Sequence, residues 1–167
     1  MVQSFSYSVT TCLPRESVWR VLTKIEEWPK FSCVYRDVKW VGEEWVLGSS
    51  LIGHLNYPIP IPFRYLLKDC IAPELIRYLA DSPELGFANE RTIRLEEVSC
   101  GTLIRVDAYT VGEPVREIPG GSLGFLKMLT EKWFFDFAHF CDNDCLQSPN
   151  CRRLDSIATA EQDSGKV

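Results

Sequence analysis

The stretch SLGFLKMLTEKWFFDFAHFC, residues 122–141, decides the fold of this chain. Its apolar residues recur every three or four positions, which is the spacing of one face of an α-helix. The stripe consists of Leu126, Leu129, Trp133, Phe137 and Phe140. Two glycines precede Ser122, which is a suitable N-cap residue. We therefore predict a long helix from Ser122 to Cys141 that packs its aromatic stripe against another layer.

A series of short runs with the pattern of β-strands comes before this helix. We expect strands at Val34–Gly42, Ser50–Tyr57, Phe63–Ala72, Leu75–Asp81, Ala88–Val98 and Leu103–Gly112. Glycine and proline separate the runs, and the connections are too short for crossover helices, which favours an antiparallel meander. In the last two runs apolar and polar residues alternate, so one face of the sheet is covered and the other is solvated.

The first part of the chain predicts one more strand and two short helices. Residues 4–11 alternate between aromatic or β-branched residues and serine or threonine. Pro14 suits the first turn of a helix, which ends before Pro29, and a second helical turn follows around Trp28 and Phe31. The pattern indicates one α+β domain over residues 1–145 and a polar tail over residues 146–167.

The composition limits the classes of function. With 167 residues, 46% of them hydrophobic, the chain has enough apolar material for one core. No apolar run approaches the ~20 residues of a membrane-spanning helix, and no basic and apolar leader opens the sequence, so we expect a cytoplasmic protein. The net charge is -5 and the cations are scattered, so we expect no nucleic-acid partner.

The cysteines do not predict a disulfide framework or a metal site. Their number is seven and their spacing is irregular. His139, Cys141, Cys145 and Cys151 are potential zinc ligands, but reliable zinc sites usually have paired cysteines two residues apart. We expect neither a metal nor a cofactor.

Several local motifs resemble one known superfamily. They are Pro14–Leu22 followed by Trp28–Phe31, Leu47–Ser49 before the third strand, Cys70–Tyr78 at a corner, and Gly101–Val106 at a strand start. Together with the order of elements, they resemble the START-like, helix-grip (SRPBCC) superfamily, in particular its polyketide cyclase/dehydrase and lipid-transport group. The resemblance implies a seven-stranded curved antiparallel sheet wrapped around the C-terminal helix, with a pocket for a small apolar molecule between them.

The residues that face this space are the candidate binding site. Leu126, Leu129, Trp133 and Phe137 either line a pocket or simply fill the core. Strand alternation adds Tyr7, Asn89, Arg91, Ile93, Val106 and Ala108 as inward positions. Asn89 and Arg91 stand out, because a polar group on a covered face needs a partner, either a ligand carbonyl or carboxylate or another protein group.

The rim of such a pocket is predicted from two connectors. Alternating prolines over residues 57–62 hold the chain extended and deny it ladder hydrogen bonds. Ile59 and Ile61 of this connector, with Ile118 of the loop before the last helix, either border the pocket mouth or belong to ordinary connections.

Three functions are compatible with these patterns. The first is noncovalent binding or transport of a small hydrophobic molecule, such as a lipid or polyketide. The second is a cyclase or dehydratase acting in the same cavity, in which Arg91, Tyr65, Tyr78 or His54 orients a carbonyl or moves a proton. The third is a ligand-free interaction module, which gains support if the core is solid. No motif for a catalytic nucleophile is visible.

Overall fold

The computed structural model describes residues 2–82, 85–115 and 117–147. The chain forms β1 (Val2–Thr11), α1 (Arg15–Leu22), the 3₁₀ turn η1 (Ile25–Glu27), α2 (Trp28–Phe31), β2 (Tyr35–Val41), β3 (Ser50–Leu55), β4 (Pro62–Ile71), β5 (Leu75–Ser82), β6 (Phe87–Val98), β7 (Gly101–Gly112) and α3 (Gly121–Gln147). This is the predicted order of a strand, short helices, a strand meander and a long helix.

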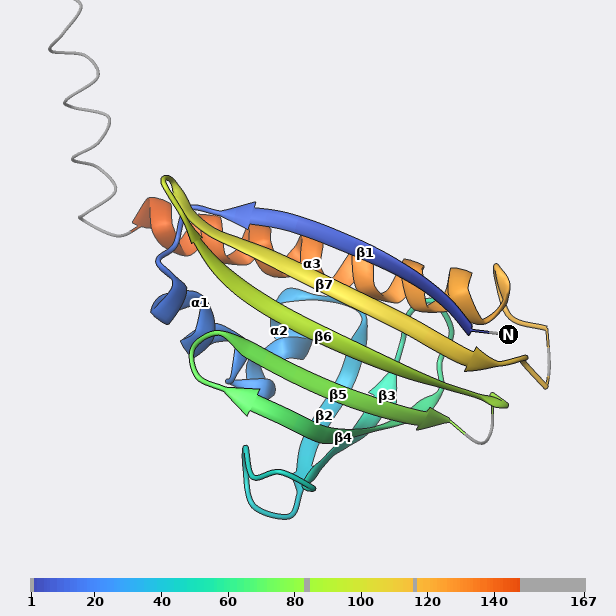
Figure 1. The fold of residues 1–167 in the computed structure, drawn as a ribbon. Helices are drawn as coiled ribbons and strands as arrows, with labels where there is room; N and C mark the ends of the chain where they lie inside the picture. Colours follow the sequence, from blue (N-terminus) through green and yellow to red (C-terminus); the bar gives the residue numbers. More distant parts are fainter. Residues whose placement is uncertain (1, 83–84, 116, 148–167) are drawn as a thin grey trace, which may run out of the picture.

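The strands form one antiparallel sheet in the order β1-β7-β6-β5-β4-β3-β2. Only β1 leaves sequence order, because it pairs with β7 along its whole length. The sheet curves, and α3 runs beneath β1 and β7 on its concave side (Figure 1). The fold class predicted from the sequence, an α+β helix-grip fold with a seven-stranded curved antiparallel sheet, is confirmed.

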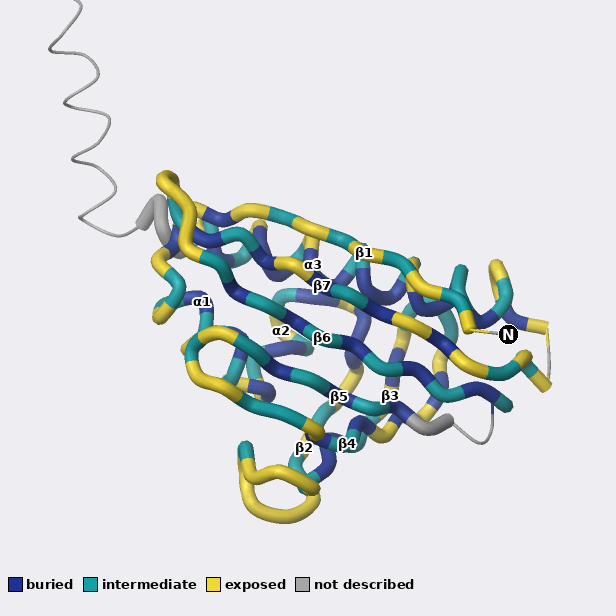
Figure 2. The backbone as a smooth tube through the Cα atoms, viewed as in Figure 1, coloured by how far each residue is buried: buried dark blue, intermediate teal, exposed yellow. Residues whose placement is uncertain are grey.

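The faces of the strands follow the predicted alternation. In β6, every second residue from Phe87 to Leu95 is buried, and in β7 the buried residues run from Thr102 to Thr110 in the same rhythm (Figure 2). The buried sets, which are apolar except for Asn89, Arg91, Thr102 and Thr110, therefore face the interior, and the residues between them lie on the outer face. The outer face carries ion pairs such as Arg94–Asp107.

The last helix is longer than its apolar stripe. It begins at Gly121 and continues to Gln147, beyond the predicted end at Cys141 and beyond the expected domain end at residue 145. Burial of apolar side chains defines the stripe, but backbone hydrogen bonding continues past it into a polar turn. The remainder of the expected tail, residues 148–167, lies outside the described residues.

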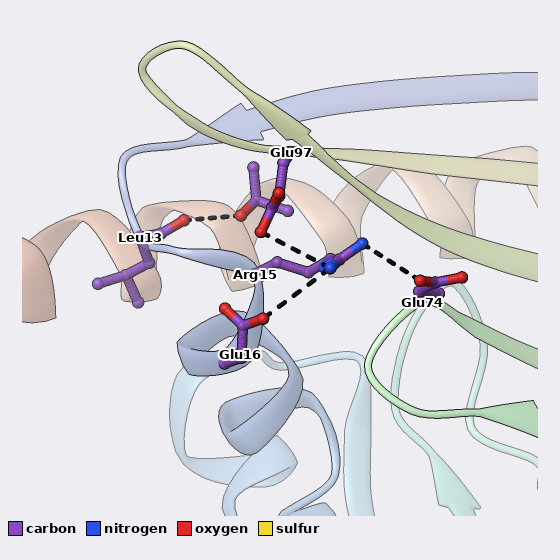
Figure 3. Close-up of polar contacts among 6 residues, drawn as sticks. Leu13, Arg15, Glu16, Glu74 and Glu97 are labelled. Atoms are coloured by element: carbon purple, nitrogen blue, oxygen red, sulfur yellow. Dashed lines mark hydrogen bonds and ion pairs between the residues drawn. The ribbon is translucent and has the colours of Figure 1, made fainter.

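The start of α1 is tied to two turns of the sheet (Figure 3). Arg15 lies between carboxylates of Glu74 in the β4–β5 turn and Glu97 at the end of β6, at nitrogen–oxygen distances of 3.5 and 3.6 Å. The Thr102 hydroxyl donates a hydrogen bond to the Leu13 carbonyl over 2.7 Å. Both glutamates are exposed, so these ion pairs stabilise the protein weakly, and their main effect is to position α1.

The end of α3 is joined to the same corner. The Asp142 carboxylate accepts a hydrogen bond from the Thr11 hydroxyl over 2.7 Å and one from the Cys12 backbone N–H over 2.9 Å. One turn and a half earlier, Asp136 accepts a bond from the Ser32 hydroxyl over 2.7 Å. The long helix is therefore fixed at its C-terminal half to both β1 and the segment after α2.

Candidate functional site

The interior between sheet and α3 contains two buried polar side chains next to each other on β6. Arg91 and Asn89 are each 6% exposed. Both point to the concave face, because they alternate with the outward residues of the strand. Arg91 lies opposite Tyr78 of β5 and Ala108 of β7, and Asn89 lies opposite Ala80 of β5.

The Arg91 guanidinium is held by aromatic groups. Its central carbon lies 4.5 Å from the centroid of the Tyr65 ring, which is cation–π geometry. The guanidinium also donates hydrogen bonds toward the hydroxyls of Tyr65 and Tyr35. Within the part of the chain that the structure describes, no carboxylate pairs with Arg91. The buried positive charge is therefore not neutralised by the described residues.

Burial determines which of these groups carry protons. It raises the pKa of Tyr35 and the pKa of Tyr78 well above the ordinary value, so both phenols stay neutral and keep their protons. Burial alone lowers the pKa of Arg91, but the Tyr65 and Tyr35 hydroxyls raise it above its usual value. Arg91 is thus a permanent cation beside neutral hydroxyls.

Two buried polar atoms close to Arg91 have no hydrogen-bond partner among the described residues. They are Tyr78 Oη, opposite Arg91 in the sheet, and Oδ1 of Asn89, two residues away on β6. An unpaired buried polar atom costs about 1–3 kcal/mol. A ligand or a water that supplied matching polar groups would recover part of this cost.

The space next to Arg91 is small. The cavity has a volume of about 10 Å³ and is lined by Leu55, Ile61, Phe63, Tyr65, Leu85, Asn89, Arg91, Phe125, Leu126 and Leu129. This is room for about one water molecule, whereas pockets for drug-sized ligands measure roughly 300–1,000 Å³. In the described conformation the interior is nearly full.

Aromatic rings occupy most of that interior. Trp133 stacks on Phe137 with centroids 5.3 Å apart, and its ring also meets Trp28 at 5.0 Å and Tyr35 at 6.0 Å. Trp133 and Phe137 are 3% and 0% exposed. Of the two interpretations of the helix stripe, the described conformation matches the one in which these rings fill the core.

The structure brings together some of the predicted binding residues and separates others. Asn89, Arg91, Leu126 and Leu129 border the cavity, as does Ile61 of the rim. The other predicted residues do not border the cavity. Ile93, Val106 and Ala108 are buried elsewhere on the inner face of the sheet, and Trp133 and Phe137 belong to the aromatic core. Tyr7 and Ile59 are half-buried, and Ile118 lines an open surface depression with Pro114 and Pro119.

His54 lies apart from the other candidate catalytic residues. It is on the exposed outer face of β3, where its Nδ1 is 3.0 Å from the Asp37 carboxylate of β2. The hydrogen bond to His54 lowers the pKa of Asp37. Tyr65, Tyr78 and Arg91 all lie inside the protein, so His54 cannot exchange a proton with them directly.

Sequence reasoning missed Tyr35 and Phe63. Tyr35 is 4% exposed, its hydroxyl donates to the Tyr65 hydroxyl over 3.4 Å, and its ring lies 5.2 Å from that of Phe63. Tyr35 is the first residue of β2, and a bulge follows it between residues 35 and 37. That bulge interrupts the alternation that would have marked Tyr35 as inward.

The described residues contain neither a cluster of metal-ligating side chains nor a membrane-spanning helix. Among the described residues, no three His, Cys, Asp or Glu side chains gather in a way that suits a metal ion. Of the candidate zinc ligands, the Cys145 side chain and Cys151 lie outside what is described. No helix in the described ranges combines the length and apolarity needed to cross a bilayer.

Comparison with known proteins supports the fold alone. No family model and no curated protein matches the sequence. Among solved structures, that of Ara h 8.0201 superposes with a TM-score of 0.70 at 13% identity, covering 84% of this chain and 98% of that chain. The protein CV1439 from Chromobacterium violaceum superposes with a TM-score of 0.59 at 15% identity, over 84% of this chain and 98% of its own.

A third similar structure is the di-domain ARO/CYC StfQ from the steffimycin biosynthetic pathway. It superposes with a TM-score of 0.70 at 12% identity, covering 86% of this chain and 52% of StfQ. These structures share the helix-grip fold with this chain, which is the fold that the sequence motifs implied. At these identities, residue roles do not transfer, so function has to be argued from the side chains of this chain.

Proposed function

We propose that the protein binds a small apolar molecule that carries an anionic or strongly accepting polar group, in the space between the sheet and α3. The observation that carries this proposal is Arg91, a 94% buried cation without a carboxylate partner among the described residues. Removing a charge from water is expensive unless an opposite charge or several hydrogen bonds compensate it. A carboxylate, sulfonate or polarised carbonyl at the end of an apolar ligand would supply that partner.

Binding on this proposal requires side chains to move apart. The cavity of about 10 Å³ does not admit a ligand of even ten heavy atoms. Ile61 of the connector at residues 57–62 and Phe63 at the start of β4 line this cavity together with Arg91, and their displacement would enlarge it. The second function, a cyclase or dehydratase, is less well supported, because Tyr35 and Tyr78 hold their protons firmly and cannot act as bases near neutral pH.

Two dyes with the same aromatic skeleton test the proposal. The first is 1-anilino-8-naphthalenesulfonate, which carries a sulfonate, and the second is N-phenyl-1-naphthylamine, which lacks it. Hydrogen bonds to charged groups contribute about 1.5–3 kcal/mol, so Arg91→Met should weaken binding of the sulfonate dye about 10- to 100-fold. Binding of the neutral dye should change little.

Arg94→Met is the matched control, because Arg94 lies on the same strand but on the outer face, where it pairs with Asp107. It should leave the binding of both dyes unchanged. Arg91→Lys keeps a positive charge and should retain part of the preference for the sulfonate. If neither dye binds the wild-type protein, or if Arg91→Met weakens both dyes equally, the proposal is wrong. The first outcome would favour the ligand-free interaction module.

A further inference from the structure

Asn89 and Thr110 form a buried polar pair on the concave face of the sheet. They lie directly opposite each other on the neighbouring strands β6 and β7 (Figure 1). Asn89 is 6% exposed and Thr110 is 1% exposed, and each belongs to the buried set of its strand. Asn89 also borders the cavity that Arg91 lines. The pair therefore extends the polar part of this cavity toward β7.

Each member of the pair has an oxygen atom without a hydrogen-bond partner among the described residues. These atoms are Asn89 Oδ1 and Thr110 Oγ1. The amide oxygen only accepts hydrogen bonds, whereas the hydroxyl both donates and accepts. Residues directly opposite each other in an antiparallel sheet have Cβ atoms about 4.5–5.5 Å apart. At that separation one additional hydroxyl group can bridge the two oxygens, with two hydrogen bonds of about 2.8 Å.

We infer that this pair binds a hydroxyl group of the ligand, so that the ligand is an apolar acid that also carries a hydroxyl. The ligand hydroxyl donates to Asn89 Oδ1 and accepts from the Thr110 hydroxyl, which satisfies both buried groups at once. The inference rests on the proposed function, because Arg91 supplies the site for the acidic group. A ligand without the hydroxyl leaves both groups unpaired, so the pair selects against it.

The sheet sets the distance between the acid and the hydroxyl of such a ligand. The Arg91 guanidinium lies 4.5 Å from the ring of Tyr65, which belongs to β4, whereas Thr110 belongs to β7. Strands β5 and β6 separate β4 from β7. A ligand that reaches both sites therefore lies across the strands, with its two polar groups roughly one to two strand spacings apart, about 5–10 Å. A hydroxyl on the ring of naphthoic acid that is remote from the carboxylate meets this requirement.

Matched acids with and without a hydroxyl test the inference. The probes are 2-naphthoic acid and its 5-, 6- and 7-hydroxy derivatives, which move the hydroxyl around the remote ring. Isothermal titration calorimetry with the full-length protein at neutral pH gives the four dissociation constants. The two hydrogen bonds should make at least one hydroxy acid bind about 10-fold more tightly than 2-naphthoic acid.

Two substitutions remove the polar atoms and keep side chains of similar size. Asn89→Leu and Thr110→Val should each abolish the preference for the hydroxy acid and leave the binding of 2-naphthoic acid unchanged. Thr92→Val is the matched control, because Thr92 also lies on β6 but on the outer face, opposite Asp107, and it should keep the preference. Arg91→Met should weaken the binding of all four acids by the same factor and therefore also keep the preference.

The outcomes separate this inference from the proposed function. If none of the acids binds the wild-type protein, or if Arg91→Met weakens none of them, the proposed function fails and the inference fails with it. If the acids bind through Arg91 but no hydroxy derivative binds more tightly than 2-naphthoic acid, only the inference is overturned. The same holds if the preference survives both Asn89→Leu and Thr110→Val. A lower urea midpoint for Thr110→Val would also overturn the inference, because the hydroxyl would then have a partner within the protein.

Discussion

Replacing Trp133 by alanine measures whether the interior is solid. The side chain is 3% exposed and contacts the rings of Trp28, Phe31, Tyr35, Phe134 and Phe137. Large-to-alanine substitutions of buried aromatics cost about 3–5 kcal/mol, through lost burial and the cavity left behind. Each aromatic pair adds roughly 0.5–1.5 kcal/mol to the free energy gained by burying its surface. We therefore expect a loss of about 4–5 kcal/mol, near the top of the range.

Urea unfolding followed by circular dichroism gives this free energy directly. In thermal unfolding the same loss should lower the Tm by about 8–20 °C, at roughly 2–4 °C per kcal/mol for a chain of this size. Phe135→Ala is the control, because Phe135 lies on the same helix but is 62% exposed, and it should cost no more than about 0.5 kcal/mol. A loss below about 2 kcal/mol for Trp133→Ala would refute the reasoning, because it would show that Trp133 borders open space.

The same variant has a second readout. The cavity left by Trp133→Ala has the shape of an indole ring, and dry apolar cavities bind matching molecules. Indole should therefore raise the Tm of Trp133→Ala by mass action, about 2.7 kcal/mol of stabilisation at one hundred times its dissociation constant. Indole should leave the wild-type Tm unchanged, since the ring position is occupied.

Further predictions concern single groups. Tyr78→Phe removes a buried hydroxyl that has no partner among the described residues, so urea unfolding should show unchanged or slightly higher stability. A loss above about 1 kcal/mol would show that this hydroxyl makes a hydrogen bond. Gly101→Ala places a methyl group against the Thr11 carbonyl oxygen of β1 and should cost at least about 3 kcal/mol. Gly48→Ala, with nothing within 4 Å of the added methyl group, should cost about 1 kcal/mol. The hydrogen bond with His54 lowers the folded-state pKa of Asp37 below its unfolded value of 3.8. The stabilisation from this pair is therefore fully present above pH 3.8 and is lost as the pH falls through the folded-state pKa. NMR titration should show this midpoint moving toward 3.8 in His54→Ala, and an unmoved midpoint would contradict the pairing.

Much of the fold was predictable because it depends on local patterns. The strand runs agree with β2 to β7 within one or two residues at each end, since period-two alternation and glycine or proline turns mark them directly. The same alternation placed Asn89 and Arg91 on the covered face. It did not reveal Tyr35, because the bulge between residues 35 and 37 shifts the phase of β2.

The state of the interior was not predictable in the same way. Whether Trp133 and Phe137 line a pocket or fill the core depends on the distance between a curved sheet and α3 relative to the summed volume of the rings. That balance involves Trp28, Tyr35 and Phe63, which come from distant parts of the chain. A sequence pattern shows on which face of a strand or helix a residue lies, but not how far that face is from the layer packed against it.

The pairing of β1 with β7 has a consequence for how the chain is made. Thr11 lies in register with Thr102, so β1 is synthesised before the whole meander and has its partner at the far end of it. At usual rates of synthesis, β1 waits about 5–20 s before β7 is complete. Closing so long a loop is entropically costly, so β1 and α3 should join the sheet last. During that interval the aromatic interior lacks its cover, and the nascent chain is most exposed to aggregation and to chaperones.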